Sequence, residues 1–175
     1  MNTFREFRTK GAERSLGELL SSVLASEVLW PSKQLWLVSP WISDMAVLDN
    51  STGAFQTLVP EWERSSVRLS QVLIHLARQR TELFVALRPV AHNAPFQAVL
   101  SEAQKTLRDR IHIFSSAHLH EKGMLGDGFY LKGSFNFTFS GIQINEEIAS
   151  FTTDVGTLCE ARIDFAAHYP KENAL

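Results

Sequence analysis

Two side chains in the C-terminal half of the chain have the types and the spacing to form a catalytic pair. His120 and Lys122 are separated by one residue, so on a strand their side chains point to the same face. A histidine in this position can attack a substrate or transfer a proton, and the neighbouring lysine supplies a fixed positive charge. The pair therefore predicts a catalytic group that binds an anion.

A second group of suitable residues follows after a tight turn at 126–128. Gly133, Ser134 and Asn136 bring a small backbone, a hydroxyl and an amide to the neighbouring strand of the expected hairpin. Gly133 permits a close approach of the backbone, and Ser134 and Asn136 share a face if the strand continues that far. Together with the first pair, these groups can cradle a phosphoryl oxygen.

In this order the residues resemble the signature of the phospholipase D superfamily, which is written H-x-K-x4-D followed by G-S-x-N. The matching positions are His120, Lys122, Asp127, Gly133, Ser134 and Asn136. The run Gly-Ser-Phe-Asn-Phe-Thr at 133–138 is similar to the small bacterial endonucleases of the superfamily, and Asn145 and Glu147 resemble the Asn-x-Glu that follows there. The interval from Asp127 to Gly133 is shorter than usual, which a tighter hairpin would absorb.

The resemblance implies a metal-independent phosphodiesterase that needs no cofactor. His120 would be the catalytic nucleophile and would form a phosphohistidine intermediate with the substrate. Lys122 would act with it in catalysis and in phosphate binding, and Ser134 and Asn136 would help to hold the non-bridging oxygens of the phosphate.

Two acidic positions complete the catalytic residues that the resemblance implies. Glu147 would orient the imidazole of His120 through its other ring nitrogen, with the adjacent Glu146 as the alternative. Asp127 matches the motif, and we expect it to be structural or charge-balancing rather than a direct reactant.

The family mechanism requires two His-Lys sets, and this sequence contains one. The other candidates, His75, His92, His112 and His168, have no lysine two residues later. The simplest solution is a homodimer whose active site lies on the twofold axis, so that each His120 meets its mate.

His118 suggests a competing interpretation as part of a metal site. His118 and His120 can be two ligands on one strand face, with Asp127 or Glu147 completing the coordination. Lys122 inside the cluster opposes a dication, and the phospholipase D pattern already accounts for His120. Hydrolysis that survives a chelator would eliminate the metal site.

The substrate that we expect is nucleic acid, most simply DNA, because the chain is small and carries a single motif like the endonucleases it resembles. The second hypothesis is a DNA-binding or organising subunit of a bacterial DNA-modification or defence complex. Residues 38–44 and 120–123 resemble the phospholipase-D-like protein of deazapurine DNA-modification clusters. A phospholipid hydrolase is the third hypothesis.

Composition and charge agree with a folded protein of ordinary surface. We interpret residues 1–175 as one phospholipase D-like domain, with a single cysteine, Cys159, and a net charge of −2. The N-terminus lacks an apolar signal segment and no apolar run is long enough to span a bilayer, which predicts a cytoplasmic protein without membrane contact. Basic residues concentrated at 64–110 indicate solvated helix faces or a basic groove.

Alternating strands and helices must position the motif, and they predict an α/β fold with a mixed sheet flanked by helices. Helices are expected at 15–28, 65–80, from Pro95 onward, and at 155–167. Strands are expected at 34–39, 82–87, 110–114, 118–125, 129–133 and 147–153, with a long irregular connection at 40–62. Of the aromatic residues, Trp41, Phe129 and Tyr130 are expected nearest to the site.

Overall fold

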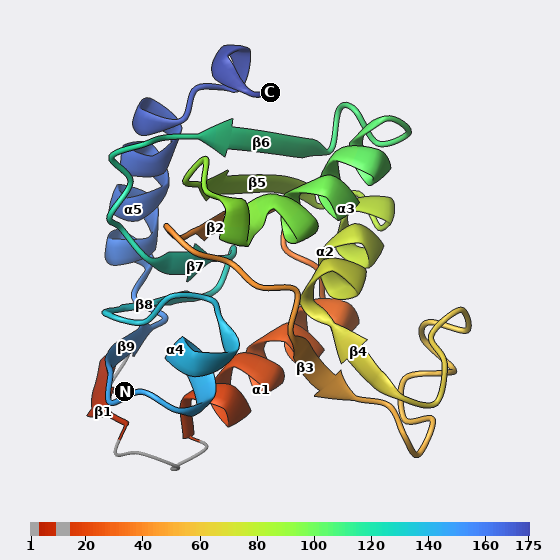
Figure 1. The fold of residues 1–175 in the computed structure, drawn as a ribbon. Helices are drawn as coiled ribbons and strands as arrows, with labels where there is room; N and C mark the ends of the chain where they lie inside the picture. Colours follow the sequence, from red (N-terminus) through yellow and green to blue (C-terminus); the bar gives the residue numbers. More distant parts are fainter. Residues whose placement is uncertain (1–3, 10–14) are drawn as a thin grey trace.

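The computed structural model describes residues 4–9 and 15–175, and its central feature is a seven-stranded sheet flanked by helices (Figure 1). The strands of this main sheet are β1 (Phe4–Arg8), β2 (Gln34–Val38), β5 (Glu82–Leu87), β6 (Ile111–Ser115), β7 (Gly123–Leu125), β8 (Tyr130–Gly133) and β9 (Ile148–Thr152). The helices are α1 (Ser15–Leu29), α2 (Leu69–Arg78), α3 (Ala94–Gln104), α4 (Phe139–Gln143) and α5 (Val155–His168). This arrangement confirms the expected mixed α/β sheet.

The main sheet is parallel on one side and antiparallel on the other, in the order β1-β9-β8-β7-β2-β5-β6. β2 pairs with β5 and β5 with β6 in parallel, because a helix separates each strand from the next along the chain. β7 pairs with β2 in the opposite direction, and β8, β9 and β1 continue the antiparallel part. As a result, Val38 at the end of β2 lies opposite Gly123 at the start of β7.

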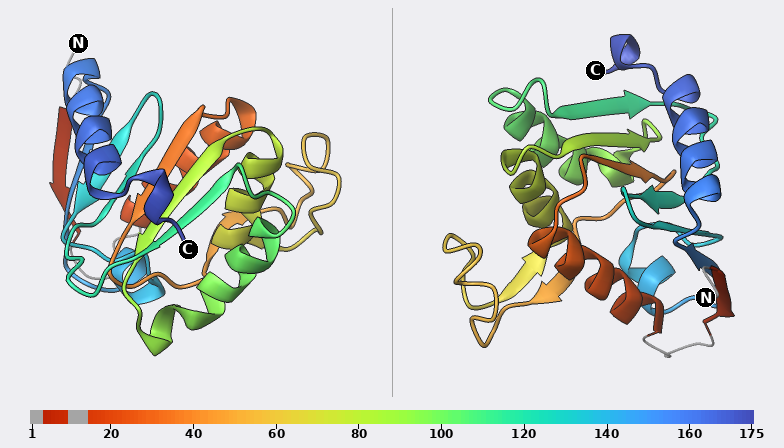
Figure 2. Two further views of the ribbon diagram at one scale, coloured as in Figure 1. Left: turned by 90° about the horizontal axis from the view of Figure 1, so that it is seen from above. Right: turned by 180° about the vertical axis from the view of Figure 1, so that it is seen from behind.

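Helices cover both faces of the sheet because alternate side chains of its central strands point to opposite faces. Leu35 and Leu37 of β2 are fully buried in the core shared with α1, α2 and α3. Trp36, between them, stacks on Phe84 of β5 with ring centroids 4.0 Å apart and also meets Phe165 of α5. Figure 2 (left) shows α5 on one side of the sheet and α2 and α3 on the other.

Four strands differ from the sequence-based expectation. The connection at 40–62 contains β3 (Ala46–Asp49), which pairs with β4 (Ser66–Arg68) in a separate two-stranded sheet, so that α2 begins only at Leu69. β1 was not expected, because its stabilising partner β9 is distant in sequence. The strand expected at 118–125 begins only at Gly123, since the pairing with β2 stops at Val38.

The last described residue packs against β6 through hydrogen bonds. Leu175 donates its backbone N–H to the carbonyl of Ile113 in β6, and its own carbonyl accepts from the side chain of Gln104. Within the described ranges, none of the helices is both long enough and apolar enough to cross a membrane.

A side chain at Gly133 is expected to disrupt the junction of β8 and β9. The Cβ of Gly133→Ala would lie 2.1 Å from the carbonyl oxygen of Ile148, a backbone atom that cannot move without shifting the strand pair. We expect the free energy of unfolding to fall by about 1–3 kcal/mol, the usual effect of overpacking. Urea unfolding followed by far-UV circular dichroism measures the change.

Gly128→Ala is the matched control, because a Cβ there would meet nothing within 4 Å. Its free energy of unfolding should stay within about 0.5 kcal/mol of that of the unchanged protein, as for ordinary surface substitutions. Equal effects of the two substitutions would contradict the close approach at Gly133.

Candidate functional site

The residues of the motif meet at one edge of the main sheet. β2 ends and β7 begins at this edge, and the pairing of Gly133 with Ala149 brings the end of β8 and the start of β9 to it as well. An open cleft of about 490 Å³ lies here. Its lining includes Glu6, His120, Lys122, Gly133, Ser134 and Ile148. We call it the His120 cleft.

His120 and Lys122 contact one another directly. The Lys122 ammonium lies 3.2 Å from Nδ1 of the His120 ring and donates to the His120 carbonyl at 2.6 Å. Both residues precede β7 rather than lying on it, so the expected strand geometry was wrong although the two side chains do meet. Because an ammonium group only donates, Nδ1 accepts, and a neutral imidazole in this contact carries its proton on Nε2.

Lys122 is held among charges of both signs. Its partial burial lowers the pKa of the ammonium below the ordinary value of 10.5, and the positive charge of Arg88 lowers it further. The Glu147 carboxylate acts in the opposite direction. Arg88 and Glu147 are therefore close enough to the Lys122 ammonium for their charges to act on it.

Glu147, rather than Glu146, belongs to this edge. Its side chain is half-buried and accepts hydrogen bonds from the Ser134 hydroxyl and, at 3.3 Å, from the Asn145 amide, whereas Glu146 is exposed. These two partners occupy the carboxylate, and neither of them is His120. The role that the resemblance implied for Glu147, orienting the imidazole, requires a rearrangement of these bonds.

Ser134 and Asn136 do not share a strand face, because β8 ends at Gly133. Ser134 turns toward β9, where its hydroxyl oxygen accepts the N–H of Ile148 at 3.0 Å. Asn136 turns toward the end of β2, where its Oδ1 lies 3.3 Å from the hydroxyl of Ser39. The structure thus places Ser134 in the His120 cleft and Asn136 beside β2.

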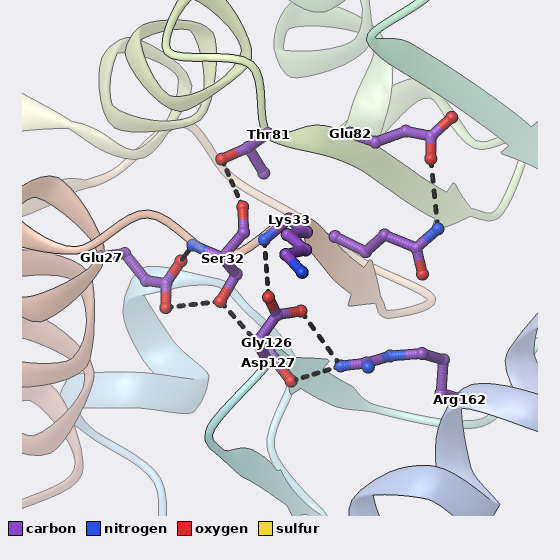
Figure 3. Close-up of polar contacts among 9 residues, drawn as sticks. Glu27, Ser32, Lys33, Thr81, Glu82, Gly126, Asp127 and Arg162 are labelled. Atoms are coloured by element: carbon purple, nitrogen blue, oxygen red, sulfur yellow. Dashed lines mark hydrogen bonds and ion pairs between the residues drawn. The ribbon is translucent and has the colours of Figure 1, made fainter.

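Asp127 is separated from the other motif residues. It follows β7, whereas Lys122 precedes it, so the length of the strand lies between them. Its carboxylate accepts the backbone N–H of Lys33 at 2.8 Å and a hydrogen bond from Arg162 of α5 at 3.4 Å (Figure 3). These contacts support the structural role of Asp127 and give no support to its place among the catalytic residues.

The same network continues into α1 through Ser32. The Ser32 hydroxyl accepts the N–H of Asp127 and donates to Glu27, which also accepts the backbone N–H of Ser32 at 2.9 Å. Burial raises the pKa of the Glu27 carboxyl, although its bonds to Ser32 act against this effect. The network joins α1, the start of β2 and the turn after β7 (Figure 3).

The metal ligands that the competing interpretation requires are not brought together. In the part of the chain that the structure describes, no group of three or more His, Cys, Asp or Glu side chains is arranged to hold a metal ion. His118 is exposed in a turn, and Asp127 lies beyond the other end of β7. His120 instead has the cation Lys122 as its neighbour.

Arg88 belongs to this edge and was not singled out from the sequence. It follows β5 directly, donates from Nε to the carbonyl of Leu119 at 2.7 Å, and lies 5.6 Å from the ring centre of Trp41. Its position after a parallel strand was the available signal, because ligands bind beyond the carboxyl ends of such strands. Several other basic residues of the middle segment have separate local partners, as in Arg78 with Glu61.

Of the three aromatic residues expected near the site, Trp41 is the exposed one, with 40% of its surface accessible. Phe129 is buried and stacks on Phe151. Tyr130 is buried against Phe165, and its hydroxyl donates to Glu121 at 3.3 Å. Only the Trp41 ring among them offers substantial free surface.

Asp127→Ala is expected to destabilise the fold. The substitution removes the acceptor of the Lys33 N–H and the partner of Arg162, which loosens the turn after β7. We expect the free energy of unfolding to fall by about 1–2 kcal/mol, typical for hydrogen bonds to a charged group that is partly exposed. Chemical denaturation provides the measurement, and Asp109→Ala, at an exposed turn position, is the control that should change little. An unchanged midpoint for Asp127→Ala would contradict the structural role.

Neither a protein-family model nor a curated protein matches the chain in sequence. Solved structures are similar to it in fold. Nuc, a phospholipase D family member from Salmonella typhimurium, has a TM-score of 0.59 at 12% identity over 98% of this chain and 95% of that one. NucT from Helicobacter pylori also gives a TM-score of 0.59 at 12% identity, over 98% of each chain.

A phosphatidylserine synthase from Haemophilus influenzae is similar at a TM-score of 0.59 and 9% identity, over 98% of this chain and 39% of the synthase. Identities this low are informative about the fold alone. The chain has the fold of the phospholipase D superfamily, which is the one that its motif predicted.

Proposed function

We propose that the protein is a phosphodiesterase that cleaves nucleic acid, with His120 as its nucleophile. The observation that carries this proposal is the meeting of His120, Lys122, Ser134 and Glu147 at one edge of a phospholipase D fold, although they come from separate elements. A histidine, a fixed cation, a hydroxyl and a carboxylate are the groups that displacement at phosphorus requires.

In the first step, Nε2 of His120 attacks phosphorus, a P–N bond forms and the bond to the leaving oxygen breaks. Lys122 and Ser134 hold the non-bridging oxygens of the phosphate during this step. Attack through Nε2 requires the ring proton to be on Nδ1, where Lys122 now donates. When the ammonium turns to the bound phosphate, it no longer donates to Nδ1. Nδ1 can then carry the ring proton, and we assign Glu147 as the acceptor of the hydrogen bond that this N–H donates.

A second imidazole must protonate the leaving oxygen and then activate the water that releases His120. The histidines outside 118–120 are engaged elsewhere: His75 with Glu61, His92 with Ser43, His112 with Glu82 and His168 with the carbonyl of Asp164. We therefore assign the second imidazole to His120 of an identical chain in a homodimer whose active site is shared.

Nucleic acid is the substrate that the motif favours, because the run at 133–138 resembles the small endonucleases and the fold is that of Nuc and NucT. The likeness to a phosphatidylserine synthase makes a phospholipid the alternative substrate to be tested. A DNA-binding or organising role within a DNA-modification complex predicts instead an isolated chain that binds DNA without cleaving it. Partner subunits of that kind and the deazapurine resemblance remain predictions.

His120→Ala is expected to abolish cleavage, because it removes the nucleophile and leaves only phosphate binding. The rate of cleavage of a fluorescent oligonucleotide in EDTA should fall on the order of a thousandfold or more. His118→Ala, at an exposed position two residues away, is the control and should keep most of the activity. Intact oligonucleotides together with hydrolysis of phospholipid vesicles would overturn the choice of substrate.

Mixing the unchanged protein with His120→Ala tests the shared site. If each site needs His120 from both chains, activity falls with the square of the unchanged fraction after subunit exchange. A linear fall would show that one chain is sufficient and would contradict the proposed dimeric site.

The pH profile should show the lowered pKa of Lys122. The ammonium must be charged to hold the phosphate, so kcat/KM should decline as pH rises through a value below 10.5. In Lys122→Arg, whose guanidinium keeps its charge, the residual activity should decline only at higher pH. Profiles of kcat/KM against pH, measured for both proteins on the same oligonucleotide, check this prediction. If the decline at high pH occurs at the same pH in Lys122→Arg, a group other than Lys122 causes it.

A further inference from the structure

Trp41 and Arg88 form a surface beside the catalytic pair that the proposed reaction leaves unused, and we call it the Trp41–Arg88 shelf. The guanidinium carbon of Arg88 lies 5.6 Å from the centre of the indole ring, and 40% of the Trp41 surface is accessible. The cation therefore lies over the indole ring, and the accessible part of the ring remains open to a ligand.

The shelf lies across the catalytic pair from the His120 cleft. In the strand order, β8 and β9 flank β7 on the side of the cleft, whereas β2 and β5, which lead into Trp41 and Arg88, lie on the other side. Arg88 also donates to the carbonyl of Leu119, the residue before His120. A chain-like substrate whose phosphate lies at His120 and Lys122 can thus extend onto the shelf.

A buried asparagine holds the two parts of the shelf in place. Asn93 is fully buried, and its side-chain oxygen accepts the N–H of Ile42 at 2.8 Å. Its amide nitrogen donates to the carbonyls of Pro40 and Arg88, at 2.8 and 2.9 Å. The backbones on both sides of Trp41 and at Arg88 are therefore fixed relative to each other, which reduces the entropy lost when a ligand binds.

The chemistry of the shelf fits an unpaired nucleotide. A base can stack on an exposed indole only when the base is not already stacked within a duplex, and stacking of this kind tolerates any base. The guanidinium over the ring can contact the phosphate that links this base to the next nucleotide. A lipid headgroup has no planar ring to place on Trp41.

We propose that the Trp41–Arg88 shelf binds an unpaired nucleotide next to the scissile phosphate, so that the protein acts on single-stranded nucleic acid or unpaired ends. The proposal rests on the proposed function for the position of the scissile phosphate. Trp41 provides the stacking surface and Arg88 contacts a phosphate that does not react.

Binding without chemistry tests the proposal. In the His120→Ala background, fluorescence anisotropy measures the affinity for a labelled single strand and for a blunt duplex of the same sequence. Adding Trp41→Leu should weaken single-strand binding about tenfold, within the range for the loss of one stacked base, and duplex binding less than twofold. Trp41→Phe, which keeps a smaller ring, should be intermediate. Trp30→Leu is the matched control, because Trp30 is 83% exposed but lies at the end of α1.

Arg88→Gln tests the other half of the shelf through salt dependence. Loss of one phosphate contact should reduce the slope of log affinity against log salt by about 0.7 for a single strand. Circular dichroism and urea unfolding check that each variant is folded. If Trp41→Leu does not fold, Trp41→Phe still tests the stacking role of the ring.

The outcomes separate this proposal from the proposed function. Equal losses for single strand and duplex, or no loss in both Trp41 variants, would overturn the shelf even if the unchanged protein cleaves nucleic acid. Selective single-strand binding that depends on Trp41, in a protein that cleaves no phosphodiester, would support the shelf and overturn the enzymatic function.

Discussion

The antiparallel pairing of β7 with β2 is the interaction on which the site depends. Strands β2, β5 and β6 form a parallel unit whose carboxyl ends face one edge. β7 runs against them, so it enters the sheet at the edge where β2 and β5 leave it. Lys122 is thereby brought beside Arg88, and the return of the chain through β8 and β9 adds Ser134 and Glu147. Without this reversal, the edge would be lined by the connections that follow parallel strands.

The turn after β7 anchors the strand, whereas the segment before β7 carries His120 and Lys122. The strand is only three residues long, so its own ladder of hydrogen bonds is too short to fix the segment before it. Asp127, after the strand, holds the turn to Lys33 and Arg162, and Ser32 extends this anchorage to Glu27 in α1. A carboxyl buried enough to have a raised pKa is an unfavourable component of a fold. Its presence here is consistent with the need to hold a short strand firmly.

Charges at the edge are arranged for an anion before one is bound. Lys122 and Arg88 repel each other, and partial burial adds to the cost of the Lys122 charge. A phosphate bound at Lys122 would relieve both costs, because it supplies negative charge beside a cation that the fold already holds in place. Electrostatic stabilisation of this kind requires little reorganisation when charge develops on the oxygens. The contact between Lys122 and Nδ1 places the His120 ring beside these charges.

The sequence by itself determined the periodic elements and singled out the candidate reacting groups. The apolar runs of β2 and β5 and the helical spacing in α5 depend on neighbouring residues in the chain, and they were predicted to within a few residues. His120 and Lys122 were recognised because two residues suffice to define their chemistry and spacing. The short strand β3 was missed because four residues give no reliable period, and β1 because only its distant partner makes it a strand.

Tertiary structure alone decided which side chains meet. The bond between Ser134 and Glu147 follows from the register of β8 against β9, and the separation of Asp127 from His120 follows from where the pairing of β7 stops. The presence of Arg88 at the site follows from the parallel pairing of β5 with β2. Local patterns fix the direction in which a side chain points along its own element. Contacts between elements depend on a register set by the packing of the whole core, which no short stretch of sequence contains.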